Sequence, residues 1–139
     1  MSYFLFTAAV LSATAAALHL GCIVFGASWY RFFGAGERMA QLAAAGSWVP
    51  TVVTAGIATV LALWSLYALS GAGIGPRLPF VRLVLCGVIG VYLVRGLAGF
   101  ALVANPLGRS AAFWLWSSGI CLAIAAVHIV GLWQFWSRL

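Results

Sequence analysis

The sequence predicts an all-α integral membrane protein in which four transmembrane helices form an antiparallel up-down bundle. Hydrophobic residues make up 65% of the 139 residues, whereas charged residues make up only 6%. So few polar side chains cannot cover the surface of a water-soluble domain of this size, and most of the surface must therefore contact lipid. The apolar residues fall into four long runs, which short segments rich in glycine and proline separate.

Each of these runs is long enough to cross the hydrocarbon core as a helix, which takes about 20 apolar residues. Pro50 falls in the first turn of the second run, where a missing backbone N–H is tolerated. We therefore expect one domain, residues 1–139, containing the spans Phe4–Ala27, Trp48–Leu69, Phe80–Val103 and Ala111–Trp133.

The first span has one feature of a cleavable signal peptide, a run of small residues from Ser12 to Ala17. However, it lacks the positively charged start of a signal, and it stays apolar as far as Ala27. This apolar stretch is longer than the hydrophobic region of a signal peptide. We therefore expect the segment to remain in the protein as a transmembrane helix.

The connection between the first two spans, residues 28–47, predicts an additional helix. Glu37 begins a run of strong helix formers, and an acidic residue in the first turn interacts favourably with the helix dipole. The aromatic residues Trp29, Tyr30, Phe32 and Phe33 precede this run and are suited to the headgroup layer. We expect an interfacial helix over residues 36–45, which either links the spans along the membrane surface or forms a lid over the bundle.

Four spans place both termini and the middle connection on one side of the membrane, here called side A. The first and third connections lie on the opposite side, side B. Arginines in the connections and termini do not decide the orientation, because three lie on each side: Arg77, Arg82 and Arg138 on side A, and Arg31, Arg38 and Arg109 on side B. The terminal amine favours side A as the cytoplasmic side. We expect a bacterial inner-membrane protein with cytoplasmic N- and C-termini.

The net charge of +6 could indicate a nucleic-acid-binding protein, but the arrangement of the charges argues against this class. The arginines lie singly among apolar residues and the chain has no lysine, so no basic groove can follow a phosphate backbone. Cys22, Cys86 and Cys121 lie within the spans and form no CxxC motif. This placement predicts buried small side chains and argues against a disulfide framework or a zinc site.

Polar residues collect in the half of the bundle nearer side B. At a rise of 1.5 Å per residue, His19 and Arg95 each lie about 6 Å from the middle of their spans towards side B. The arginines of this end outnumber Glu37, the only acidic side chain, so an anionic ligand is favoured there. We expect the ligand-binding residues to be His19, Glu37, Tyr92, Arg95, Arg31, Arg38 and Arg109.

Arg95 also has a structural interpretation. An arginine within a span costs at least about 2.5 kcal/mol unless it is paired or reaches the membrane surface. Arg95 lies close enough to side B to extend to that surface. It could instead pair with Glu37, if the interfacial helix folds over the bundle.

The two histidines do not predict a haem site. His19 lies towards side B and His128 towards side A, about 13 Å apart along the membrane normal. Axial ligands of one iron must lie at nearly the same level. The single acidic side chain also excludes carboxylate pairs for metal binding or acid–base catalysis. We therefore expect no cofactor, no metal and no catalytic residue, and an enzyme is disfavoured.

These observations predict a non-enzymatic membrane protein with a polar, net-positive pocket that binds a membrane lipid or another anionic amphiphile. Three alternatives remain: an accessory subunit of a larger membrane complex, an oligomeric channel or transporter, and an intramembrane lipid-modifying enzyme. Small residues at a spacing of four, such as Ala8, Ser12 and Ala16, allow close helix packing within one chain or between copies. The expected partner is a lipid, with a membrane protein or a second copy of the chain as alternatives.

Overall fold

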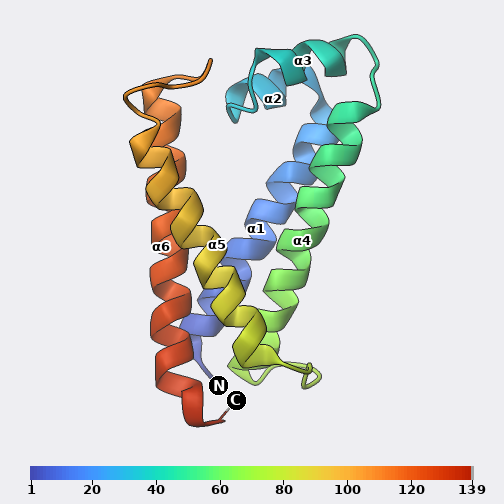
Figure 1. Ribbon diagram of the computed structural model, residues 1–139. Coiled ribbons are helices and arrows are strands. Elements are labelled where there is room, and N and C mark those ends of the chain that lie inside the picture. The colour runs from blue at the N-terminus through green and yellow to red at the C-terminus, as the bar shows by residue number, and fades with distance from the viewer. Residues whose placement is uncertain (139) are drawn as a thin grey trace.

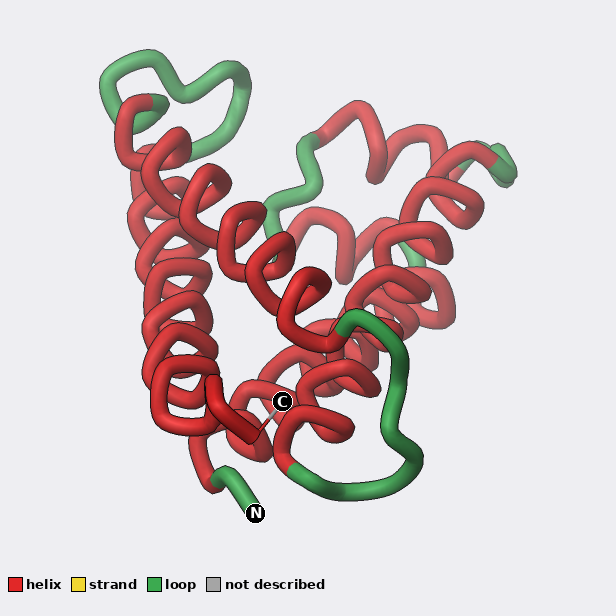
Figure 2. The backbone as a smooth tube through the Cα atoms, turned by 60° about the horizontal axis from the view of Figure 1, so that its bottom comes forward, coloured by secondary structure: helices red, strands yellow, loops and turns green. Residues whose placement is uncertain are grey.

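The computed structural model describes residues 1–138, and it confirms the predicted fold class (Figure 1). Helices account for all the regular secondary structure of this part of the chain, and short loops join them (Figure 2). Four of the helices are long and apolar enough to cross a membrane. In chain order the helices are α1 (Tyr3–Phe25), α2 (Ala27–Phe32), α3 (Glu37–Ala44), α4 (Val49–Ala72), α5 (Val81–Ala101), α6 (Ala111–Phe135) and the 3-10 helix η1 (Trp136–Arg138).

The four long helices agree with the predicted spans except at their ends. α1 ends at Phe25 because Gly26 adopts φ 72° and ψ −143°, a conformation that only glycine adopts readily. α4 continues to Ala72, and Gly73 then ends it in the left-handed conformation. The predicted interfacial helix is α3. The aromatic segment before it forms a further short helix, α2, which the sequence did not predict.

The bundle is built from two helix pairs. α1 packs along α4, and α5 packs along α6, while contacts between α1 and α6 and between α4 and α5 join the pairs. The two pairs approach each other closely at side A, where both termini lie, and diverge towards side B (Figure 1). At side B, α2 and α3 lie across the ends of the helices.

Small residues hold side A together. Leu5 of α1 is completely buried, and it packs against Gly71 of α4 and Gly131 of α6. The backbone N–H of Ser2 donates to the carbonyl of Ala72 at 3.0 Å, which fixes the N-terminus to the end of α4. Since lipid tails are as apolar as leucine, helices in a membrane associate through such close packing rather than through the hydrophobic effect.

Candidate functional site

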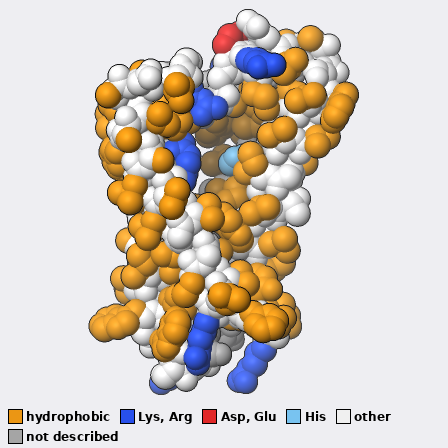
Figure 3. Space-filling model, in the orientation of Figure 1, with side chains coloured by type: hydrophobic (Ala, Val, Ile, Leu, Met, Phe, Trp, Pro, Cys, Tyr) orange, Lys and Arg blue, Asp and Glu red, His pale blue; other side chains and the backbone are white. Residues whose placement is uncertain are grey.

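A hollow opens at side B between the two helix pairs. Figure 3 shows apolar side chains over the surface around it, and arginine and histidine side chains at its edges. α5 and α6 form one wall, α1 and α4 form the other, and α2 and α3 lie above it (Figure 1). We call this hollow the side-B cleft.

Tyr92 of α5 lies where the two pairs meet, at the inner end of the side-B cleft. Its hydroxyl shares a hydrogen bond of 3.2 Å with the hydroxyl of Ser12 on α1. Its ring packs edge-on against Trp64 of α4, with the ring centroids 5.3 Å apart, and lies 5.7 Å from the ring of His128 on α6. Tyr92 is buried and contacts all three other long helices, so it closes the inner end of the cleft.

Arg95 lies one turn closer to side B on α5, and α6 holds its guanidinium. The Nη2 atom donates to the Ser117 hydroxyl at 3.1 Å, and the guanidinium carbon lies 5.0 Å from the ring centroid of Trp114. A Cβ atom at Gly99 would overlap the Ser118 hydroxyl and lie 2.7 Å from Nη1, so the glycine leaves room for both groups. Within residues 1–138, Nη1 and the hydroxyl of Ser118, which both border Gly99, are buried and have no hydrogen-bond partner. An unsatisfied buried donor costs about 1–3 kcal/mol, so a hydrogen-bond acceptor at this point would stabilise the structure.

Arg109, in the connection before α6, approaches the same aromatic side chain. Its guanidinium carbon lies 5.5 Å from the ring centroid of Trp114 and 5.1 Å from that of Phe113. Its Nη2 atom donates to the carbonyl of Ala35 at 3.0 Å, which connects α6 to the segment between α2 and α3. Burial lowers the pKa of Arg109, and the positive charge of Arg95 lowers it further. Two guanidinium groups therefore share one tryptophan with no acidic side chain between them.

Glu37 pairs with Arg31, so the alternative pairing of Glu37 with Arg95 is wrong. The Nε and Nη2 atoms of Arg31 donate to the two carboxylate oxygens at 3.0 and 2.9 Å, and the side chains are 50% and 57% exposed. The physical reason is local: α2 and α3 fold back on each other, which brings residue 31 beside residue 37. The hydrogen bond from Arg31 lowers the pKa of Glu37, and the pair is lost as pH falls through that lowered pKa.

The structure thus divides the predicted ligand-binding residues into two groups. Arg95 and Arg109 meet at Trp114, with Tyr92 at the inner end of the cleft and His19 half-buried on α1. Nδ1 of His19 donates to the Ala15 carbonyl at 2.7 Å. Arg31, Glu37 and Arg38 lie exposed on α2 and α3, outside the cleft.

Trp114 and Ser117 were not among the residues predicted to form the site. Trp114 is buried, and its indole N–H donates to the carbonyl of Pro106 at 2.8 Å, which fixes the ring beneath both guanidiniums. The spacing of three residues places Trp114 and Ser117 on one face of α6, at the level of Arg95. An aromatic residue at this position is therefore a signal that could have indicated a platform for arginine.

The segment from α2 to α3, residues 27–44, forms a lid with its own anchors. The Tyr30 hydroxyl shares a buried hydrogen bond of 3.0 Å with Thr54 of α4. The ring of Trp29 covers Gly21 of α1, where an added Cβ would lie 2.5 Å from a ring carbon. On the other side, Gly34 lies directly against the ring of Phe113. The lid therefore contacts both helix pairs.

Gly34→Ala is expected to release the lid from α6. Gly34 has φ +74°, which costs an L-residue about 1–2 kcal/mol, and its new methyl group would overlap the Phe113 ring. Hydrogen exchange of residues 27–44 should become about tenfold faster, in line with a loss of about 1.4 kcal/mol. Gly46→Ala is the matched control, because Gly46 has φ +75° and no atom within 4 Å of its added Cβ. Equal exchange rates in the two variants would show that the Phe113 contact does not hold the lid.

Within the described residues, 1–138, no three histidine, cysteine or acidic side chains lie together in a group that could hold a metal ion. The arrangement at side B instead offers hydrogen-bond donors and positive charge to an anion. Comparison of the chain with protein-family models, with curated proteins and with solved structures finds no match.

Proposed function

We propose that this protein is a non-enzymatic membrane protein that holds the anionic headgroup of a membrane lipid in the side-B cleft. The observation that carries the proposal is the meeting of Arg95 and Arg109 at Trp114. The only acidic side chain of the chain, Glu37, is bound by Arg31 outside the cleft, so it does not neutralise these two charges.

The chemistry of the two arginines favours a phosphate or carboxylate group. A guanidinium presents its N–H donors in a planar fork that matches two oxygens of such a group. Arg95 is only partly buried and uses Nη2 for its hydrogen bond to Ser117, so other N–H groups of the guanidinium remain for a bound oxygen. Although burial lowers the pKa of Arg109, arginine remains protonated in proteins, so both positive charges persist at neutral pH.

A lipid suits the cleft better than a small water-soluble anion. The hollow lies between membrane-spanning helices, and apolar side chains surround its opening (Figure 3). A ligand that enters between the helix pairs from the bilayer therefore needs apolar parts that face lipid and one anionic part that reaches Arg95. Polar groups that face the interior of a membrane bundle commonly mark a ligand or ion pathway.

The proposal also covers the location of the protein. We propose the inner membrane of a bacterium, with both termini in the cytoplasm. Side B then faces the periplasm, and the cleft receives a lipid of the outer leaflet. The exposed arginines of side A, Arg77, Arg82 and Arg138, then lie at the cytoplasmic surface, where anionic lipids attract them.

Competition between two lipids tests the proposed function. Delipidated protein in detergent is mixed with equal amounts of phosphatidylglycerol and phosphatidylcholine that carry identical acyl chains, and the lipid adducts are measured by native mass spectrometry. Both lipids carry a phosphate, but the choline of phosphatidylcholine adds a positive charge that the two arginines repel, so we expect a preference of about tenfold or more for phosphatidylglycerol. Equal retention of the two lipids would contradict the proposal.

A further inference from the structure

A groove runs along one flank of α5 and includes Arg95. It has a volume of about 530 Å³, and apart from Arg95 its lining is apolar. The lining residues are Gly87, Gly90, Val91, Val94, Arg95 and Ala98.

The groove faces away from α6. On the opposite flank of α5, Gly96 packs so closely on α6 that an added Cβ would lie 2.6 Å from a methyl carbon of Leu122. Val91 and Val94, in contrast, are exposed, and nothing lies within 4 Å of a Cβ added at Gly90. In a membrane this flank meets lipid. Gly87 and Gly90 have no side chain, and they therefore leave a depression in the surface of α5.

We infer that the groove holds one acyl chain of the lipid whose headgroup Arg95 binds. This inference rests on the proposed function, and it identifies the ligand as a lipid that enters sideways from the bilayer. Arg95 borders the groove in its half nearer side B, almost all of the lining surface is apolar, and the guanidinium lies on the adjoining flank of α5 against α6. This matches an anionic headgroup followed by a hydrocarbon chain.

The length of the groove agrees with a chain of a single leaflet. From residue 87 to residue 98 a helix rises about 16 Å, which is about half of the 30 Å hydrocarbon core. α5 spans residues 81–101, so the groove runs from about 6 Å on the side-A side of its midpoint to about 10 Å on the side-B side, and about two thirds of it lies in the half nearer side B. A lipid of the side-B leaflet therefore has its chain beside α5 at the depth where the groove lies. An acyl chain gains no hydrophobic free energy when it leaves other lipid chains and enters the groove. Its binding therefore depends on how well it fits the shape of the groove.

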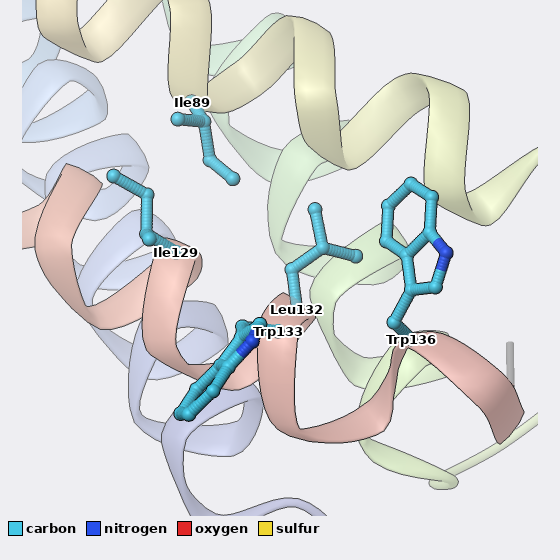
Figure 4. Close-up of a pocket in the computed structure, with 5 residues that line it drawn as sticks. All are labelled: Ile89, Ile129, Leu132, Trp133 and Trp136. Carbon is cyan, nitrogen blue, oxygen red and sulfur yellow. The ribbon is translucent and has the colours of Figure 1, made fainter.

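A second apolar pocket provides the competing site. It has a volume of about 280 Å³ and lies between α5 and α6 towards side A (Figure 4). Its lining residues are Ile89, Ile129, Leu132, Trp133 and Trp136. The guanidinium of Arg82 lies 5.3 Å from the Trp136 ring, so this pocket also has a cation nearby. The two sites lie on different helix faces, and a covalent label therefore distinguishes them.

Photocrosslinking tests the inference. The probe is phosphatidylglycerol with a diazirine in the middle of one acyl chain, and labelled residues of the intact protein are mapped by peptide mass spectrometry. We expect labels on the groove residues Val91, Val94 and Ala98 of α5, whereas a label on Ile89 would report the second pocket. Gly90→Leu fills the groove and should reduce this labelling about fivefold, which corresponds to about 1 kcal/mol. Gly119→Leu on α6 is the matched control, since nothing lies within 4 Å of its added Cβ, and labelling should stay unchanged.

The outcomes separate this inference from the proposed function. Labels at residues 129–136, or labels spread over all four long helices, would overturn the groove as the chain site. The same result would leave the preference for phosphatidylglycerol intact. If a phosphatidylcholine probe with the same diazirine labelled Val91, Val94 and Ala98 equally well, the headgroup charge would not matter and the proposed function would fail. Gly90→Leu should unfold in detergent at the wild-type temperature, because nothing lies within 4 Å of its added Cβ, which shows that a loss of labelling is not a loss of fold.

Discussion

Arg95→Leu is expected to abolish the preference for phosphatidylglycerol over phosphatidylcholine. The substitution removes the only side chain that both lines the α5 groove and stacks on Trp114. It also removes the guanidinium N–H groups that we assign to lipid oxygens. Without the Arg95 charge the choline of phosphatidylcholine is repelled less, so the ratio of the phosphatidylglycerol adduct to the phosphatidylcholine adduct should fall by about tenfold or more. Native mass spectrometry of the variant with the same lipid mixture measures the ratio.

Arg77→Leu is the control for the loss of one positive charge. Arg77 is exposed in the connection between α4 and α5, at the opposite end of the bundle from the cleft. This variant should retain the wild-type lipid preference. If Arg95→Leu also retained it, Arg95 would not bind the headgroup.

The thermal stability of Arg95→Leu provides a second measurement. Nη2 of Arg95 makes one hydrogen bond, to Ser117, while Nη1 is buried without a partner among the described residues. Replacement of buried charged groups by apolar ones is often neutral or stabilising. The unfolding temperature in detergent, without added lipid, should therefore stay the same or rise. A large decrease would indicate that the arginine mainly supports the bundle.

Gly131→Leu is expected to separate α1 from α6 at side A. A Cβ at position 131 would lie 2.8 Å from Cγ of Leu5 and 2.9 Å from its backbone nitrogen, and a backbone atom cannot rotate away. Excess volume in a packed interior costs about 1–3 kcal/mol of folding stability. Because leucine adds further atoms beyond Cβ, we expect the loss for Gly131→Leu at or above the upper end of this range. The unfolding temperature in detergent should fall by several degrees.

Gly119→Leu is the matched control for this prediction as well. It lies on the same helix, and its added Cβ meets no atom within 4 Å. Its unfolding temperature should be close to that of the wild type. An equal decrease in both variants would mean that the close contact with Leu5 does not determine stability.

The sequence predicted the fold because a membrane imposes few solutions. The length and apolar character of a segment are sufficient to indicate a span, and Gly26 and Gly73 shift only the exact ends. α3 was predictable because Glu37 begins a run of helix formers. α2 was not, because six residues are too short for a periodic pattern, and the helix depends on packing of Tyr30 and Trp29 against α4 and α1.

The depth of the candidate-site residues in the membrane could be predicted from the sequence, but their side-chain interaction partners could not. A constant rise per residue was enough to place Arg95 and His19 in the half of the bundle nearer side B. The partner of Glu37 depended on the path of the chain between α2 and α3, where Gly34 and Gly36 both have positive φ. This change of direction brings the carboxylate of Glu37 beside the guanidinium of Arg31. The shared platform at Trp114 depended on how α5 packs on α6, which a single sequence does not reveal.

The divergence of the two helix pairs makes the molecule a wedge. Leu5 and its glycine neighbours fix the narrow end at side A, whereas the pairs spread apart at side B (Figure 1). A change in the angle between the pairs therefore alters the area that the protein occupies in the side-B leaflet, and it has little effect on the area in the side-A leaflet. Such a shape couples the width of the opening to the lateral pressure and the curvature of the surrounding bilayer.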